Sequence, residues 1–298
     1  MSPASPVAVI DLARRRVRRA SLHRNLEAVA FGTREKLSID VREKDDDFAL
    51  VLDQITKPLA CDNVGLQRLM AEFRNSGIAD AAIERLSAKS PSARRQSARL
   101  LGAVRMTQAV TLLAPLLESK DRVVVDAAAR ALGRIGGAQS AQMLLMAIQR
   151  IGLRRTLIGE LARAAPDLFL EVVLSEAQRP GLKPAAALAA GLRRRQTAVG
   201  PLVALLIHGT PRERAISCRA LGWIGSSAAV PAVIAAVEDP KWKVRVAAAK
   251  ALRALHSGTA ILDLERLRAD RNRRVRQASA AALRRLLRDV KVVELTWL

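Results

Sequence analysis

The sequence contains no tyrosine, and with four phenylalanines and three tryptophans its aromatic residues make up only 2% of 298 residues. A hydrophobic core must therefore be filled mainly by alanine, leucine, valine and isoleucine, and hydrophobic residues make up half of the chain. Small side chains favour closely packed helices. Convincing runs of alternating β-branched residues are also missing, so we predict an all-α fold with almost no strand.

Residues that usually carry chemistry are scarce as well. The two cysteines, Cys61 and Cys218, lie far apart without metal-ligand spacing, which excludes a disulfide framework and favours two inert thiols in a reducing compartment. His23, His208 and His256 are widely separated and form no metal-binding motif. We find no phosphate-cradling glycine loop and no pairing of a nucleophile with a base. We therefore expect no cofactor, no metal and no catalysis.

Long apolar runs are missing too. The longest stretch without charge, about Gln196 to Ile207, is too short to cross a membrane and contains Gly200 and Pro201. The first 30 residues carry too many arginines to form a secretory signal. We expect a cytoplasmic protein.

What the chain does have is an internal repeat of about 31 residues. A helix rich in small residues ends repeatedly in the same way, as in VVDAAARALGRIG and RAISCRALGWIG, and a second apolar segment follows. Two helices in each repeat are therefore expected, stacked on their neighbours because one hairpin alone cannot bury its apolar face. We call the recurring residue near the end of the first helix the marker residue; the markers are Leu101, Leu132, Leu161, Ala190, Leu221, Leu252 and Leu283.

One copy, EDPKWKVRVAAAKALRAL from Glu238 to Leu255, carries a recognisable pattern. It resembles the bacterial HEAT-like repeats, also called phycobilisome-lyase-like HEAT repeats, whose units read roughly D-P-x-x-x-V-R-x-x-A-A-x-A-L-G-x-x-G followed by A-V-P-x-L. The resemblance covers about Lys89 to Asp289. It implies an α-solenoid of about seven HEAT-like helical hairpins, and it implies no single function because the repeat serves many roles.

The sequence divides into four segments. Residues 1–60 read as a basic helix, starting at Ser5 and Pro6 and reaching about Ala30, followed by a charged helical or linker segment. Residues 61–88 read as an amino-terminal capping pair of helices with Gly77 between them. The repeats occupy 89–290, and 291–298 form a carboxyl-terminal tail for which disorder is favoured over docking through Trp297.

A cation recurs seven residues before the marker in six of the seven repeats. In similar repeats this residue pairs with an aspartate in the turn of the same or the adjacent repeat, and two aspartates stand six residues before their arginines. We interpret the series as a structural ladder, and we expect Arg245→Ala to lower stability. Its members are Arg94, Arg154, Lys183, Arg214, Arg245 and Arg276, with Asp239 and Asp270.

The formal net charge is +22, with 50 basic and 28 acidic residues. Cations two residues before the marker point away from the ladder, and further arginines cluster at turns and near the end of the repeats. They form either a solvated face or a surface for a polyanion such as nucleic acid. Trp223 and Trp242 are the available stacking residues, and core packing is the favoured interpretation of Trp242. The polyanion-binding candidates are Arg99, Arg130, Arg193, Arg194, Arg195, Arg219, Lys250, Arg274, Arg284 and Arg285.

The segment from Arg14 to Arg24 holds six arginines beside a narrow apolar stripe of Ile10, Ala13, Val17 and Ala20. It could hold the protein against an anionic lipid surface, at about 1 kcal/mol for each basic residue. Similar bacterial proteins often carry a membrane anchor just before such a segment, and here no anchor is found.

These observations favour a non-catalytic scaffold or adaptor that binds a protein partner. The concave wall formed by the second helices is the expected surface, around Gln142, Met143, Met146 and Gln149, since methionine-containing walls adapt to partners. The other interpretation of these methionines is core between repeats. The alternative functions are sequence-tolerant binding of nucleic acid along the arginine-rich face and, more remotely, a bilin lyase-like enzyme.

Overall fold

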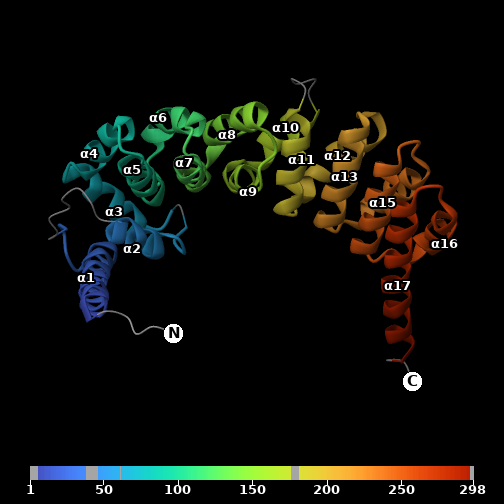
Figure 1. The fold of residues 1–298 in the computed structure, drawn as a ribbon, viewed down its shortest axis with the longest axis horizontal. Coiled ribbons are helices and arrows are strands. Elements are labelled where there is room, and N and C mark those ends of the chain that lie inside the picture. The colour runs from blue at the N-terminus through green and yellow to red at the C-terminus, as the bar shows by residue number, and fades with distance from the viewer. Residues whose placement is uncertain (1–5, 38–45, 61, 176–180, 296–298) are drawn as a thin grey trace. The chain divides into compact units, whose positions relative to one another are not determined.

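The computed structural model describes residues 6–37, 46–60, 62–175 and 181–295, and every regular element within these ranges is helical. The chain forms two compact units, Met1–Ala147 and Ile148–Leu298. The boundary falls inside a helix of the second repeat rather than at a boundary of the four segments read from the sequence. The all-α prediction is confirmed, and each unit is a stack of helical hairpins (Figure 1).

The first unit opens with α1 (Pro6–Phe31), α2 (Asp46–Thr56), α3 (Val64–Asn75) and α4 (Ile78–Glu84). The Asn63 side chain caps α3 by accepting hydrogen bonds from the backbone N–H groups of Gly65 and Leu66. Gly77 adopts a left-handed conformation, with φ of 72°, and so turns the chain into α4. Phe48 of α2 stacks on Phe73 of α3 with ring centroids 5.8 Å apart. Two of the chain's few aromatic side chains thus fill this amino-terminal core, together with Leu26 and Leu52.

Two repeats complete the first unit. The first pairs α5 (Pro91–Ala103) with the short α6 (Val110–Leu113), and the second pairs α7 (Arg122–Ile135) with α8 (Gly137–Ile151), which runs across the boundary. Turns of 3₁₀-helix extend α6 on both sides, at Thr107–Ala109 and Ala114–Glu118. Pro115 lies at the beginning of the second of these turns. Proline is tolerated there because a backbone N–H group at the start of a helix has no helical acceptor.

The second unit holds the remaining repeats in the same order. The pairs are α9 (Arg155–Ala164) with α10 (Asp167–Ser175), α11 (Leu182–Leu192) with α12 (Val199–His208), α13 (Pro211–Ile224) with α14 (Val230–Ala235), and α15 (Trp242–Ala254) with α16 (Ile261–Arg266). The first helices α11, α13, α15 and α17 (Arg273–Leu295) pack directly on one another in one layer (Figure 1).

The end of the chain differs from the sequence prediction in two respects. The seventh copy is a single long helix, α17, rather than a hairpin, and this helix also takes in residues 291–295 of the predicted tail. No glycine or proline follows Leu283, so nothing in the sequence ends the helix there. Trp297 lies outside the described residues.

All seven marker residues are buried, none of them more than 4% exposed. The residue after the marker explains why the repeats need small side chains. A Cβ atom placed on Gly102 would lie 2.5 Å from the Cα of Ala131, and one on Gly222 would lie 2.9 Å from the Cα of Ala251. Neighbouring first helices therefore meet backbone to backbone, at a distance that glycine and alanine allow.

Candidate functional site

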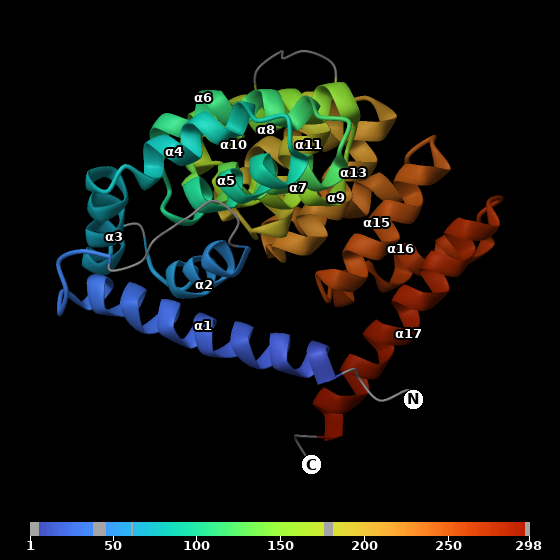
Figure 2. The same cartoon turned by 60° about the vertical axis from the view of Figure 1, so that its left-hand side comes forward.

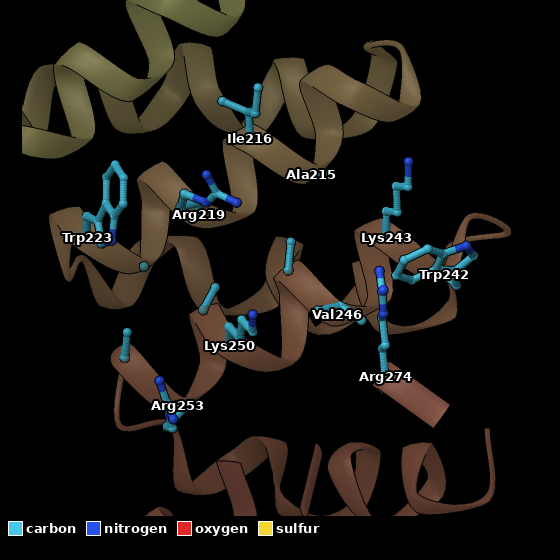
Figure 3. A pocket seen from close by; sticks show the side chains of 14 residues that line it. Ala215, Ile216, Arg219, Trp223, Trp242, Lys243, Val246, Lys250, Arg253 and Arg274 are labelled. Carbon is cyan, nitrogen blue, oxygen red and sulfur yellow. The ribbon is translucent and has the colours of Figure 1, made fainter. Parts of the chain in front are cut away.

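A basic groove lies along the first helices of the second unit (Figure 3). Its volume is about 510 Å³, and its walls come from α13, α15 and the beginning of α17. The sequence period brings these residues together, because equivalent positions of α13 and α15 are one repeat apart and the two helices pack side by side. The lining residues are Ala215, Ile216, Arg219, Gly222, Trp223, Trp242, Lys243, Val246, Ala247, Lys250, Ala251, Arg253, Ala254 and Arg274.

The charge of the basic groove has one sign. Five of these lining residues are cations, and none of them is an aspartate or glutamate. Arg219, Lys250 and Arg274 are three of the polyanion-binding candidates identified in the sequence, and all three are exposed. Lys243 and Arg253 add two cations that the repeat pattern alone did not select. Such clustered positive charge attracts an anionic partner and repels a cationic one.

Two tryptophans form apolar walls at opposite ends of the groove (Figure 3). Trp223 is 39% exposed, an unusually high value for so large an apolar side chain. Trp242 is half-buried, and its ring lies 5.3 Å from the Arg274 guanidinium and 5.8 Å from the Lys243 ammonium. These cation–π contacts hold both cations at the rim of the groove. Packing therefore accounts for only part of the environment of Trp242.

The floor of the basic groove is apolar and made of small residues. Gly222 of α13 and Ala251 of α15 are the residues through which the two helices approach each other, and both line the groove. Long cationic side chains rise on either side of this floor. The arrangement can take up an apolar side chain at the bottom while binding negative charge at the rim.

The basic surface continues beyond the groove onto α17. A second cavity of about 550 Å³ is lined by Arg253, Ala281, Arg284 and Arg288, so Arg253 belongs to both cavities. Arg284 is a further sequence candidate that the structure places in this surface. Arg285 is also exposed on α17 but does not line either cavity.

The structure does not bring the remaining polyanion-binding candidates into the basic groove. Arg99 of α5 and Arg130 of α7 belong to the first unit, where Arg130 is exposed. Arg193 and Arg194 are exposed at the end of α11. Arg195 forms an ion pair with Asp167 at 2.5 Å, and this contact gives it a structural partner within the second unit.

The wall expected around α8 is exposed rather than buried in a core. Gln142, Met146 and Gln149 are exposed, Met146 to 42%, and Met143 is half-buried. Gln142 and Met146 belong to the first unit and Gln149 to the second. A binding role for these four residues stays a prediction.

The arginine ladder crosses from one repeat to the next. The Arg214 guanidinium donates to both carboxylate oxygens of Asp239, at 2.7 and 3.0 Å, and Arg245 does the same to Asp270, at 2.6 and 3.0 Å. The aspartate six residues before the arginine contributes its backbone instead, since Arg245 Nη1 donates to the Asp239 carbonyl at 2.8 Å. Each of these two arginines therefore joins the turn of its own repeat to the turn of the next.

These contacts shift the pKa values of both partners. The hydrogen bond from Arg245 lowers the pKa of Asp270, and the same hydrogen bond raises the pKa of Arg245. Burial raises the pKa of Asp239, but the hydrogen bonds and charge of Arg214 and the N–H of Lys241 outweigh it, so the net pKa is lowered. Arg276 donates to the Asp270 and Arg271 carbonyls, and among the described residues it has no hydrogen-bonded carboxylate partner, although its charge also helps to lower the pKa of Asp270.

The earlier repeats also have cations at the ladder position, but among the described residues these cations do not form a bidentate pair of hydrogen bonds with an aspartate. Arg94 and Arg154 lie at the beginning of α5 and α9, and Lys183 lies near the start of α11. Within the described residues, the arrangement in which one arginine joins two turns is found at Arg214 and Arg245. The ladder is thus most complete in the repeats that form the basic groove.

Other residues of chemical interest lie apart from the groove. Burial raises the pKa of the Cys218 thiol to about 12, so this thiol stays protonated at neutral pH. Cys61 lies outside the described residues. His23 pairs with Glu27 on α1, whereas His208 ends α12, and the described residues contain no cluster of three potential metal ligands. No helix in the described part of the chain is long and apolar enough to span a membrane.

Comparison with known proteins agrees with the repeat pattern. A sequence profile for HEAT repeats matches residues 79–162 and 201–284. No curated protein matches the chain.

Solved structures give distant matches. Human deoxyhypusine hydroxylase in complex with glycerol is 18% identical, covering 90% of this chain and 98% of its own, with a TM-score of 0.38. An engineered protein is 21% identical over 70% of this chain and 98% of its own, with a TM-score of 0.38. A designed armadillo repeat protein in complex with the peptide (KR)4 is 19% identical over 79% of this chain and 99% of its own, with a TM-score of 0.39. At this distance the three matches carry no argument about what this chain binds.

Proposed function

Because the chain belongs to the HEAT-repeat family, we propose that it is a non-catalytic scaffold that holds a protein partner by an acidic segment of that partner. The observation that carries this proposal is the basic groove, in which five cations and two tryptophans surround a floor of small apolar residues with no acidic lining residue. A repeat scaffold binds along the surface that its stacked helices present. Here that surface is formed by first helices.

The chemistry of the groove describes the partner segment it would fit. Carboxylates of the partner would meet Arg219 and Lys250 along the middle of the groove and Arg274 at one end. A leucine-sized or phenylalanine-sized side chain would lie on the floor beside Trp223. A buried apolar anchor within a charged rim is the arrangement that gives most of the binding energy in protein interfaces.

Binding to a model peptide tests the proposal. Trp223 and Trp242 are two of the three tryptophans in the chain, so their fluorescence reports on groove occupancy directly. We expect a peptide of alternating glutamate and leucine to change this fluorescence, and the affinity to fall as salt is added. The variant Arg219→Gln/Lys250→Gln should bind at least about tenfold more weakly, a loss of about 1.4 kcal/mol.

The control is the variant Met146→Gln, which alters the exposed wall on α8 and leaves the basic groove intact. It should bind the peptide as the wild type does. If Met146→Gln abolished binding and the groove variant did not, the partner surface would be the α8 wall predicted from the sequence. Equal binding by all three proteins would exclude both surfaces.

Single-stranded nucleic acid is the second candidate for the basic groove. The exposed Trp223 favours it, because bases stack on aromatic rings at about 1 to 3 kcal/mol each while cations follow the phosphates. The same titration with an oligothymidine distinguishes the two partners. Tighter binding of the oligothymidine than of the acidic peptide, with loss in Trp223→Ala, would replace the protein partner by nucleic acid.

A further inference from the structure

The position directly after the marker residue changes along the chain. It holds glycine or alanine in the first five repeats and arginine in the last two, at Arg253 and Arg284. Where glycine stands, as at Gly222, the next first helix comes so close that a Cβ would lie 2.9 Å from the Cα of Ala251. A residue that has a Cβ cannot keep this distance. Helices α15 and α17 therefore cannot meet through Arg253 as α13 and α15 meet through Gly222.

The cavity of about 550 Å³ beside Arg253 occupies this place between α15 and α17, and we call it the arginine pocket. Arg253 comes from the last turn of α15, and Figure 2 shows α17 continuing past the end of that helix. Arg284 and Arg288 lie on one face of α17, about 6 Å apart along its axis. Ala281 continues this face with a side chain too short to fill the pocket. The lining residues are Arg253, Ala281, Arg284 and Arg288.

The arginine pocket has three positive charges and no acidic lining residue. All three arginine side chains are exposed, and the described residues supply no carboxylate partner for any of them. Arg288 Nε donates to the Arg284 carbonyl at 3.2 Å, which turns this side chain back along the helix towards Arg284. An anion bound among the three guanidinium groups would offset their mutual repulsion.

The number of charges and of acceptor oxygens distinguishes the anions that fit such a pocket. A carboxylate or a phosphodiester carries one negative charge and two free oxygens. A phosphomonoester carries about 1.5 to 2 negative charges at pH 7 and three terminal oxygens. Guanidinium groups match the geometry of phosphate, and each of the three can donate to a different oxygen. A phosphomonoester is therefore the anion that satisfies all three arginines.

We propose that the arginine pocket binds a phosphorylated side chain of the partner segment whose acidic and apolar residues lie in the basic groove. This inference rests on the function proposed for that groove. Arg253 lines both cavities, and Figure 3 shows it at the opposite end of the groove from Arg274. A segment that follows the groove as far as Arg253 therefore reaches the arginine pocket directly. Phosphorylation of the partner would strengthen its binding to the scaffold.

Peptides that differ in one terminal residue test the arginine pocket. Each has blocked ends and alternating glutamate and leucine for the groove, and it carries phosphoserine, serine or glutamate at one end or at the other, to cover both directions of binding. Fluorescence anisotropy of the labelled peptides measures affinity. We expect one of the phosphoserine peptides to bind at least about tenfold more tightly than its serine form. Its glutamate form should gain at most about threefold, because it supplies a single charge.

The ratio of the affinities for the phosphoserine and serine peptides isolates the pocket, since the groove contributes to both. In the variant Arg284→Gln/Arg288→Gln this ratio should fall below about 2. The matched control, Arg273→Gln/Arg285→Gln, removes two exposed arginines of α17 that line neither cavity, and it should keep the wild-type ratio. Glutamine is a good helix former, so α17 should persist in both variants, which circular dichroism checks.

The proposal is overturned if the wild type binds the phosphoserine peptide no more tightly than the serine or the glutamate form, or if both double variants lower the ratio equally. It is also overturned if free phosphoserine competes as strongly as the whole peptide, because the ligand would then be a small phosphate compound. Weaker binding of an oligothymidine without a terminal phosphate by the pocket variant alone would assign the pocket to phosphodiesters instead. The groove proposal alone fails if Arg219→Gln/Lys250→Gln binds the serine peptide normally while the pocket variant still loses the ratio.

Discussion

The ion pair between Arg245 and Asp270 offers the sharpest test of how the repeats are held together. Its side chains are 17% and 7% exposed, and Arg245 makes four hydrogen bonds: two to the Asp270 carboxylate, one to the Asp239 carbonyl and one to the Pro240 carbonyl. The variant Arg245→Ala removes all four. The Asp270 carboxylate then keeps one described hydrogen bond, from the Asn272 N–H at 2.7 Å.

The size of the effect follows from the burial of the pair. An exposed ion pair contributes about 0 to 1 kcal/mol, and breaking a buried one costs about 3 to 5 kcal/mol. Since this pair is partly buried, we expect Arg245→Ala to lower the free energy of unfolding by about 2 to 3 kcal/mol. Urea unfolding at neutral pH, followed by circular dichroism, measures the loss. Arg276→Ala is the matched control, because it removes two carbonyl contacts without separating an arginine from a bidentate carboxylate partner.

The pH dependence of the loss identifies its cause. Arg245 lowers the pKa of Asp270 in the folded state, so the pair stabilises the fold above the unfolded pKa of about 3.9. This contribution is lost as the pH falls through the lowered folded pKa. The difference between wild type and Arg245→Ala should therefore be full at pH 7 and shrink in acid below about pH 4. A variant as stable as wild type at pH 7, or a difference that does not change in acid, would refute the role given to the pair.

Two further predictions concern glycines and the left-handed positions. Gly222→Ala should destabilise the fold by about 1 to 3 kcal/mol, because the new Cβ would lie 2.9 Å from the Cα of Ala251. At Gly200 a new Cβ would have no atom within 4 Å, so Gly200→Ala should instead stabilise the fold by about 0.5 to 1 kcal/mol. Equal effects of Gly222→Ala and Gly200→Ala on thermal unfolding would contradict the packing argument. Arg194 and Gly225 both stand four residues after a marker and both have a positive φ, 51° and 81°. Glycine adopts this conformation without strain and other residues do not. Arg194→Gly should therefore raise the melting temperature, and Gly225→Ala should lower it. Shifts of the same sign in the two variants would show that this turn is not strained.

The sequence predicted the fold well because its strongest signal is a spacing. Residues such as Leu101 and Leu221 recur at the same place in each repeat, and burial of every one of them follows from stacking equivalent hairpins. The positive-φ residue that stands four positions after five of the seven markers was less visible. Glycine marks this position at Gly136 and Gly225, but Arg105, Arg194 and His256 occupy it in the other three repeats, and a non-glycine residue gives no sequence signal of a positive φ.

The direction of the ladder could not be read from spacing alone. Asp239 stands six residues before Arg245 and twenty-five residues after Arg214, and both separations recur along the chain. The structure uses both, since Asp239 gives its carbonyl to Arg245 and its carboxylate to Arg214. A separation in sequence identifies candidate partners, whereas the choice of backbone or side chain depends on how neighbouring turns meet.

The basic groove was only half visible in the sequence for a related reason. Arg219 and Lys250 share one repeat position, two residues before the marker, and were identified by it. Trp223 and Arg253 occupy different repeat positions, but each lies three or four residues after one of those cations and so shares its face of the helix. Combining the repeat period with the helical period would have found them. The repeat period alone identifies equivalent residues of successive helices, and the helical period alone identifies residues on one face of one helix. The groove residues are found only when the two periods are used together.

The floor of the groove links the stability of this chain to the binding proposed for it. Gly222 and Ala251 let α13 and α15 approach closely, and the same lack of side chains leaves a depression between the longer residues on either side. A larger residue at Gly222 would therefore act twice, by separating the helices and by filling the floor. A larger residue at Ala247, which also lines the groove, would fill the floor at a position that is only half-buried. The variant Ala247→Leu should therefore still fold but bind a partner that uses this floor more weakly. Measuring both its affinity and its unfolding separates loss of binding from loss of structure.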